Sequence, residues 1–243
     1  MNMSVRQERQ ASARPESGIS PRTRLILFSA LGLGLLLMVA ALWFAVARPV
    51  KVLPRIRPMP AFALADQYGL PLNSSDLAGR QVLINVTYTG CGDECAAQRQ
   101  GLVALRESLR AEGRLGREVI FLTISFDPAR DTPASLQTYA AQLGADRDSW
   151  RFVSGEPTEL KALIGGELGI YYAPPDAAGR IEHEQDVLLI DGNGVLRARY
   201  NGAALDQARL QRDLAMVREE LGSTGAMRQV YEASHIFLCY PPD

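Results

Sequence analysis

The sequence contains few of the residues that most often bind metals, nucleotides or nucleic acids. Among 243 residues there are only two histidines and three cysteines, the formal net charge is -1, and no glycine-rich nucleotide-binding loop or internal repeat occurs. A near-neutral chain lacks the basic surface on which nucleic-acid binding depends, so we expect no nucleic-acid partner. The missing glycine loop gives no support to nucleotide binding.

Two of the three cysteines lie together where a predicted strand is followed by a predicted helix. β-Branched residues are dense from Val82 to Thr87, which is typical of a buried strand, and apolar residues then recur at helical spacing over 94–112. Cys91 and Cys95 are therefore near the start of a helix. Free backbone N–H groups and the helix dipole stabilise a thiolate at such a position.

The spacing of these cysteines limits which reactions or ligands the pair can support. On one helix face, residues four apart have Cβ atoms about 5–6 Å apart, whereas an unstrained disulfide needs about 3.8 Å. A disulfide therefore requires the first turn to adjust, and a metal held by two thiolates spans the gap more readily. Soft sulfur ligands select Cu(I), zinc or the iron of iron–sulfur clusters. Zinc and iron–sulfur iron need more strong ligands than two thiolates provide. The alternative of two buried, unreactive cysteines is disfavoured because the flanking residues describe an exposed turn: Gly90, Gly92, Asp93 and Glu94.

One long apolar run lies near the N-terminus. Residues 25–47 carry no charge and, as a helix, reach about 34 Å, which is enough to cross a hydrocarbon core of about 30 Å. We expect a transmembrane helix there, after a disordered segment at 1–24. A cleaved signal peptide is the alternative, but its apolar region is normally shorter. Arginines flank both ends of the run, so charge alone leaves its orientation open.

The remaining chain alternates strands and helices. After a proline-containing tether at 48–60, a globular domain is predicted over 61–221, followed by a C-terminal tail at 222–243. Strands are predicted at 82–87, 119–126, 151–153, 187–190 and 195–200, and helices at 94–112, 132–143, 158–168 and 206–221. The DGNG turn at 191–194 indicates a hairpin between the last two strands.

This order predicts the α/β class, with a mixed sheet covered by helices on both faces. Paired cysteines at the end of the first core strand are typical of a thioredoxin-like fold. The usual redox motif of that fold is C-x-x-C, whereas this chain has three residues between its cysteines.

Several segments together resemble the SCO/SenC family of copper chaperones for cytochrome c oxidase. They are TYTGCGDEC, TISFDPARDTP, LGIYYAP and EHEQDVLLIDGNGVLRARYNG, in the family's order and spacing over roughly residues 60–221. The resemblance implies a membrane-anchored, thioredoxin-like domain outside the cytoplasm, on the periplasmic side in a bacterium. It also implies a copper site formed by both cysteines of C-x-x-x-C and one distant histidine.

On this sequence the implied ligands are Cys91, Cys95 and His183. Two thiolates and an imidazole suit Cu(I), and the imidazole lets the same site hold Cu(II). Without the resemblance, a solvated loop residue is the favoured interpretation of His183. Asp127 belongs to the DPARD segment and is predicted either to orient a ligand or merely to begin a helix. The chain departs from the family pattern where proline is common, since Gly92 and Ala96 follow the cysteines.

Three functions fit these residues. The first is a metallochaperone that accepts copper from a donor protein and delivers it to the copper-bearing subunit of cytochrome c oxidase. The second is a thiol–disulfide oxidoreductase that reduces client cysteines before copper loading, which needs Cys91 and Cys95 but not His183. The third, a peroxidase with Cys91 as nucleophile, is disfavoured because a second cysteine four residues away would interfere. Whether the chain is an enzyme depends on which of these holds.

The tail lies outside the resemblance. His235 and Cys239 are four residues apart and would share a helix face as an extra metal pair, but Pro241 and Pro242 follow at once. We therefore predict a loosely packed tail. Cys239 is the odd cysteine, and in an oxidising compartment it would be able to pair with another chain or attack a Cys91–Cys95 bridge.

Overall fold

The computed structural model describes residues 20–47 and 51–237, which fall into two units divided near residue 49. The first unit contains one helix, α1 (Pro21–Ala47), which is long and apolar enough to cross a membrane. Its Leu25–Trp43 side chains are exposed. The helix begins inside the segment predicted as disordered, because the Ser20 hydroxyl accepts the N–H of Thr23 and caps the first turn. Residues 1–19 of that segment lie outside the described residues.

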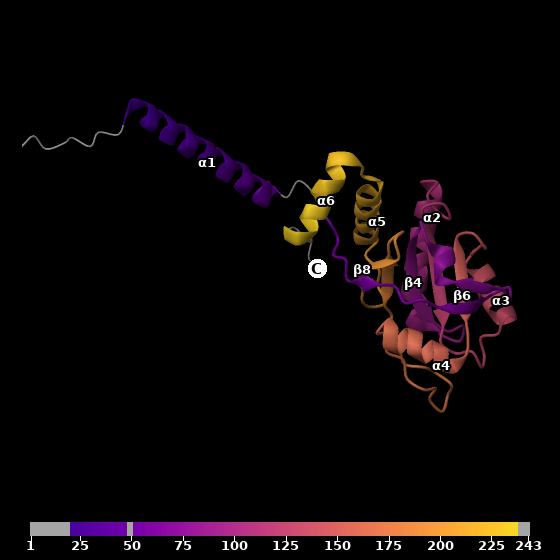
Figure 1. The fold of residues 1–243 in the computed structure, drawn as a ribbon. Helices are drawn as coiled ribbons and strands as arrows, with labels where there is room; N and C mark the ends of the chain where they lie inside the picture. The colour runs from indigo at the N-terminus through magenta and orange to yellow at the C-terminus, as the bar shows by residue number, and fades with distance from the viewer. Residues whose placement is uncertain (1–19, 48–50, 238–243) are drawn as a thin grey trace, which may run out of the picture. The chain divides into compact units, whose positions relative to one another are not determined.

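The second unit is built on an eight-stranded mixed sheet with the strand order β1-β8-β7-β4-β5-β6-β2-β3 (Figure 1). β4 pairs in parallel with β5, and β5 with β6, whereas the remaining pairs are antiparallel. The strands are β1 (Arg57–Pro58), β2 (Ala63–Asp66), β3 (Pro71–Asn73), β4 (Gln81–Thr87), β5 (Val119–Ser125), β6 (Trp150–Ser154), β7 (Val187–Ile190) and β8 (Val195–Tyr200).

Helices cover both faces of this sheet, as predicted. They are α2 (Ala96–Ala111), α3 (Pro133–Gln142), α4 (Pro157–Leu160), α5 (Gln207–Gly222) and α6 (Gly225–Phe237), with short helical segments η1 (Ser74–Leu77), η2 (Asp93–Cys95) and η3 (Lys161–Glu167). Apolar residues of α2, α3 and α5 pack on one face, and those of α4 and η3 pack on the other. All residues of β4 and β5 are buried, which explains why these strands read as continuous apolar runs.

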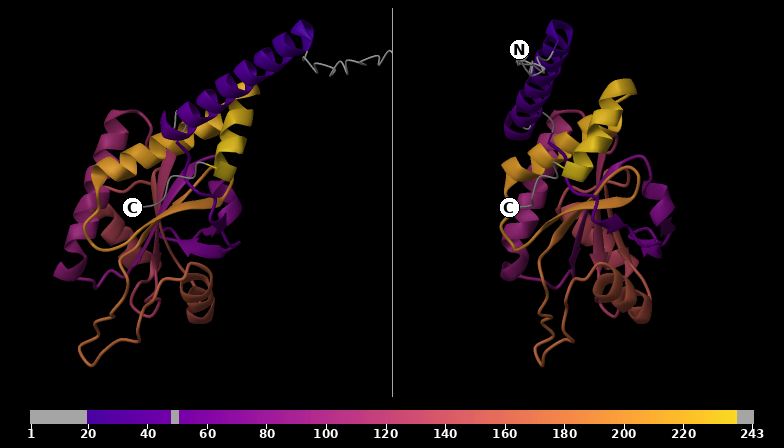
Figure 2. Two further views of the ribbon diagram at one scale, coloured as in Figure 1. Left: turned by 90° about the vertical axis from the view of Figure 1, so that its left-hand side faces the viewer. Right: turned by 60° about the vertical axis from the view of Figure 1, so that its left-hand side comes forward.

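The carboxyl ends of the parallel strands define one end of the domain. The loop after η3, which leads back to β7, extends at this end, whereas α6 lies at the opposite end (Figures 1 and 2). Because β7 runs antiparallel to β4, the start of β7 lies beside the end of β4. The topology therefore brings the 171–186 loop to the turn that holds the cysteines.

Two segments predicted to be loose are packed on the domain. In the predicted tether, Val52 and Leu53 are buried and β1 pairs with β8. In the tail predicted to be loosely packed, Gly225–Phe237 form a helix, α6. Glu232 of α6 pairs with Arg55 at 2.8 Å.

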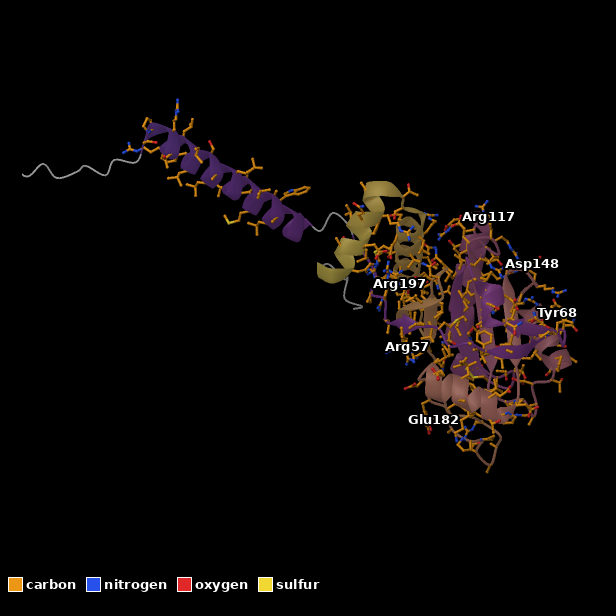
Figure 3. The ribbon with its side chains drawn as sticks, in the orientation of Figure 1. Arg57, Tyr68, Arg117, Asp148, Glu182 and Arg197 are labelled. Atoms are coloured by element: carbon orange, nitrogen blue, oxygen red, sulfur yellow. A yellow bond between two sulfur atoms is a disulfide. The ribbon has the colours of Figure 1, made fainter. Side chains whose placement is uncertain are left out.

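A buried arginine joins the predicted tether and α5 to the sheet. Arg197 of β8, labelled in Figure 3, is fully buried. It donates to the carbonyl of Leu53 at 2.7 Å and pairs with Asp191 at 2.9 Å and Glu220 at 2.5 Å. A buried cation with this many acceptors is stabilising only while all of them are present.

Candidate metal centre

The two cysteines lie in the turn between β4 and α2. Cys91 precedes η2, and Cys95 is the residue before α2 begins. Their Cα atoms are 5.9 Å apart and a disulfide joins them. The expectation that the pair shares a helix face was wrong, because Cys91 lies outside the helix. Its N–H donates to the Tyr88 carbonyl at 3.1 Å, which leaves the pair free of helical spacing and within the range of disulfide geometry.

His183 reaches this turn from the loop before β7. Its Nε2 lies 3.5 Å from Cys95 Sγ, and its Nδ1 lies 3.0 Å from the Ile181 carbonyl. Because a carbonyl can only accept, Nδ1 carries the proton and Nε2 presents its lone pair to the sulfur. The ligand atoms of Cys91, Cys95 and His183 all lie within 4.8 Å of one another. The structure thus brings together the three residues predicted from the sequence.

Aromatic rings surround the imidazole. Phe126 lies 5.0 Å from the His183 ring and Tyr88 lies 6.0 Å from it, edge-on. Tyr172 stacks on Phe126 at 4.9 Å and pairs with His183 through an isolated β-bridge. Burial raises the pKa of Tyr172. These contacts fix the ring in one orientation, as a preorganised ligand requires.

Two side chains tie the histidine loop to the cysteine turn. The Tyr88 hydroxyl accepts the N–H of Ile181 at 3.2 Å. The Gln185 amide donates to the Glu94 carbonyl at 2.9 Å. Both bonds join residues about 90 positions apart in the sequence, so the distance between His183 and the sulfurs depends on them.

The carboxylate of Asp131 holds the turn that carries the cysteines. It is buried, and its carboxylate accepts the Thr89 N–H at 3.0 Å and the hydroxyls of Thr89 and Ser125 at 2.5 Å each. The sequence pointed to Asp127 instead, but the carboxylate of Asp127 accepts from Arg130. Arg130 in turn donates to the Gly179 carbonyl at 2.7 Å. Asp127 therefore positions Arg130, which holds the 171–186 loop. The signal that would have found Asp131 is the second aspartate of DPARD.

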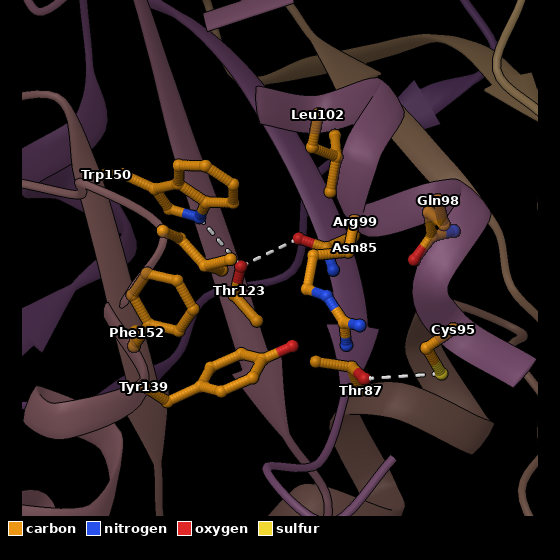
Figure 4. Close-up of a pocket in the computed structure, with 11 residues that line it drawn as sticks. Asn85, Thr87, Cys95, Gln98, Arg99, Leu102, Thr123, Tyr139, Trp150 and Phe152 are labelled. Atoms are coloured by element: carbon orange, nitrogen blue, oxygen red, sulfur yellow. Dashed lines mark hydrogen bonds between the residues drawn. The ribbon is translucent and has the colours of Figure 1, made fainter. Parts of the chain in front are cut away.

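A small polar cavity lies behind Cys95 (Figure 4). Its volume is about 10 Å³, close to the space that one water needs. The Thr87 hydroxyl donates to Cys95 Sγ at 3.8 Å from one wall. Trp150 donates to Thr123, which donates to Asn85, on the other wall. The buried amide nitrogen of Gln98, also in the lining, has no hydrogen-bond partner within the described part of the chain.

The second histidine does not join this centre. His235 lies on α6 and donates from Nε2 to Glu220 at 2.8 Å, at the other end of the domain. Cys239, considered with it as an extra metal pair, lies outside the described residues.

The donor set fits a soft metal ion. Two sulfurs and an imidazole nitrogen free of hydrogen are ligands that copper accepts. If first-row bond lengths are about 2.3 Å to sulfur and about 2.0–2.1 Å to nitrogen, the S···N edge of a tetrahedral site is about 3.6 Å. The observed Cys95 Sγ–His183 Nε2 distance of 3.5 Å equals that edge within its uncertainty.

Comparison with known proteins shows which family and which folds this chain resembles. The SCO1/SenC family model matches residues 54–219. A protein from Stutzerimonas stutzeri whose name describes it as copper-binding is 30% identical over 171 residues, which are 69% of this chain and 80% of that protein. A SCO1/SenC family lipoprotein from Bacillus anthracis has a similar fold, with a TM-score of 0.62 at 22% identity over 68% of this chain and 98% of that one. The structure of Bradyrhizobium japonicum ScoI with copper bound is similar with a TM-score of 0.52 at 27% identity, covering 65% of this chain and 98% of that one.

Proposed function

This chain belongs to the SCO1/SenC family, and we propose that it is a membrane-anchored copper chaperone. In this proposal Cys91, Cys95 and His183 bind copper, which is the cargo of the protein. The copper then passes to the copper-bearing subunit of cytochrome c oxidase.

The convergence of Cys91, Cys95 and His183 is the observation that carries the proposal. Three strong donors within 4.8 Å are enough to hold Cu(I), and they leave it short of the four ligands of a closed structural site. An under-coordinated ion is able to accept a thiolate from a partner protein before it leaves the first protein. This arrangement favours transfer by ligand exchange over permanent storage.

The disulfide makes copper loading depend on reduction. A disulfide holds its sulfurs about 2.05 Å apart, whereas two thiolates on one tetrahedral metal are about 3.8 Å apart at bond lengths of about 2.3 Å. The Cys91–Cys95 bond must therefore open before copper binds. A copper donor protein would load only the dithiol form.

The helix and the disulfide together support the proposed location. α1 is the membrane anchor in this proposal, and the domain lies outside the cytoplasm, on the periplasmic side in a bacterium. Disulfides persist in such oxidising compartments and are rare in the cytosol.

The test is the Cu(I) affinity of the full chain in detergent micelles after anaerobic reduction. We expect one tight equivalent in the parent. Because His183 supplies one of three donors, His183→Ala should lower the affinity at least about tenfold while the dithiol reduction potential stays nearly unchanged. His235→Ala is the matched control, since it removes the other histidine, and it should keep the parent affinity. Equal affinities of His183→Ala and the parent would contradict the three-ligand site.

The disulfide also favours a second candidate, a thiol–disulfide oxidoreductase that reduces client cysteines before they receive copper. That activity needs Cys91 and Cys95 but no imidazole ligand. A chain that binds no Cu(I) yet reduces a client disulfide, with His183→Ala as active as the parent, would favour this function.

A further inference from the structure

Glu94 is an acidic side chain in the cysteine turn that contacts one of the two sulfurs. It lies in η2 directly before Cys95, and its side chain is exposed. Its Oε1 is 3.6 Å from Cys91 Sγ and 3.4 Å from the Tyr88 hydroxyl, which donates to it. Its backbone carbonyl accepts from Gln185. The carboxylate is thus held beside one sulfur by the same residues that position the histidine loop.

The distance from this carboxylate to the sulfur matches that between two ligands of one metal ion. With bonds of about 2.3 Å to sulfur and about 2.0–2.2 Å to a carboxylate oxygen, the S···O edge of a tetrahedral site is about 3.6 Å. The observed separation between Glu94 Oε1 and Cys91 Sγ is 3.6 Å. The Cys95–His183 separation of 3.5 Å matches the corresponding S···N edge. Both separations are seen while the disulfide joins the sulfurs, and Glu94 lies outside the group of three ligand atoms that are within 4.8 Å of one another, so the carboxylate adjoins the centre at Cys91 only.

We propose that Glu94 is a fourth donor to the copper site and that it binds the ion in the Cu(II) state. The proposal rests on the proposed function, because it assumes copper at Cys91, Cys95 and His183. Carboxylates are hard ligands, whereas Cu(I) prefers sulfur and Cu(II) accepts oxygen and nitrogen. Glu94 therefore discriminates between the two oxidation states.

Charge favours the same assignment. Two thiolates and Cu(I) carry a net charge of -1, so a bound carboxylate would make it -2. Two thiolates and Cu(II) carry no net charge, and a bound carboxylate would make the net charge of the site -1. Like charges close together are costly in a partly buried site, so the carboxylate stabilises the doubly charged ion more than the singly charged one.

The Glu94 carboxylate must move to reach an ion held by the other three residues. Glu94 contacts the Cys91 sulfur and His183 contacts the Cys95 sulfur, so the carboxylate must turn toward the space between the sulfurs. An exposed glutamate turns freely about its side-chain bonds, and its 3.4 Å bond to Tyr88 is at the long end of the hydrogen-bond range. Reduction of the disulfide opens the same space.

The experiment compares Glu94→Gln with the parent as full chains in detergent micelles, reduced and metal-free. Cu(I) affinity is measured by competition with a Cu(I) chelator. Cu(II) affinity is measured by stopped-flow competition with a Cu(II) chelator, and the Cu(II) site is characterised by electron paramagnetic resonance. Loss of a ligand's outer partner already costs about 10–100-fold in metal affinity. We therefore expect at least about a tenfold loss for Cu(II), a changed resonance spectrum, and Cu(I) affinity within about threefold of the parent.

Asp93→Asn is the matched control, because it removes the same charge from the exposed neighbouring residue. It should leave both affinities and the spectrum unchanged. Glu94→Ala must repeat the loss seen with Glu94→Gln, which excludes an effect of the new amide. Unchanged Cu(I) affinity in the Glu94 variants shows that the site itself is intact.

The outcomes separate this inference from the proposed function. A parent that binds Cu(I) tightly while Glu94→Gln keeps the parent's Cu(II) affinity and spectrum overturns the role of Glu94 and leaves the chaperone proposal standing. Equal losses for Cu(I) and Cu(II), or an equal loss in Asp93→Asn, also overturn it. A parent that binds neither ion overturns both proposals.

Discussion

Replacing Asp131 tests whether the cysteine turn is held by a single buried carboxylate. This side chain accepts three hydrogen bonds, two from Thr89 and one from Ser125. A hydrogen bond to a charged group contributes about 1.5–3 kcal/mol, and a buried donor left without a partner costs about 1–3 kcal/mol. Thr89 is only half-buried and regains water, whereas Ser125 is buried and does not.

The simple sum of three such bonds overstates the effect, because bonds in one network are not additive. Breaking a buried charged network by removing one partner typically costs about 3–5 kcal/mol, and we expect this range for Asp131→Ala. For a domain of this size each kcal/mol shifts Tm by about 2–4 °C, so Tm should fall by about 6–20 °C. Asp131→Asn keeps the shape and one acceptor oxygen, so its loss should be smaller.

The assay is thermal and denaturant unfolding of the reduced full chain, followed by circular dichroism, together with the Cu(I) competition titration. Asp148→Ala is the control, because Asp148 is exposed on a loop, and such changes usually stay within about 0.5 kcal/mol. We also expect Asp131→Ala to weaken Cu(I) binding, since Thr89 is two residues before Cys91. A loss of stability below about 1 kcal/mol, with parent copper affinity, would refute the role given to Asp131.

Two further predictions concern the loop and the far end of the domain. Tyr88→Phe keeps the ring beside His183 but leaves the buried N–H of Ile181 without its acceptor, so it should lower the free energy of unfolding by about 1–3 kcal/mol and weaken Cu(I) binding. Tyr68→Phe, a change at an exposed residue, should do neither. Unchanged unfolding and copper affinity in Tyr88→Phe would show that the loop is held by other contacts. Burial alone would raise the pKa of Glu220, but hydrogen bonds from Arg197 and His235 outweigh it and hold the pKa below the ordinary 4.5. Because the folded pKa is depressed, Glu220 stabilises the fold above about pH 4.5 and this contribution is lost as the pH falls through the folded pKa. Unfolding from pH 7 to pH 3 should therefore show a shallower acid-dependent loss of Tm in Glu220→Gln, and a lower Tm at pH 7 because Arg197 loses a partner; parallel Tm curves would contradict this.

The sequence predicted most of what depends on local patterns. The hairpin strands Val187–Ile190 and Val195–Tyr200 have the predicted bounds because the DGNG turn that joins them is a local signal. Thr132 caps α3 with Pro133 at its first position, also as predicted. The short strands β2 and β3 at one side of the sheet were not predicted, because three or four residues carry too little periodicity to stand out.

Contacts between distant segments were the part that the sequence could not supply. Thr89 and Asp131 are 42 residues apart, and their bond exists because β4 and β5 are neighbours in the sheet. Cys95 and His183 are separated by 88 positions that the topology bridges, and the loop position of His183 pointed to it only weakly until the family resemblance was added. The spacing of the cysteines led to the wrong prediction that both lie on one helix face, because Cys91 lies before the helix rather than on it.

The buried Arg197 has a practical consequence for making a soluble fragment. Its bonds to the carbonyls of Leu53 and Pro54 mean that a fragment beginning at residue 58 would leave a fully buried guanidinium short of two acceptors. A fragment that begins just after α1 retains Val52 and Leu53 and so keeps both carbonyl acceptors. The C-terminal boundary must lie beyond Glu220, because Glu220 also pairs with Arg197. Cloning boundaries for this domain are therefore set by one interior side chain and not by where the regular sheet begins.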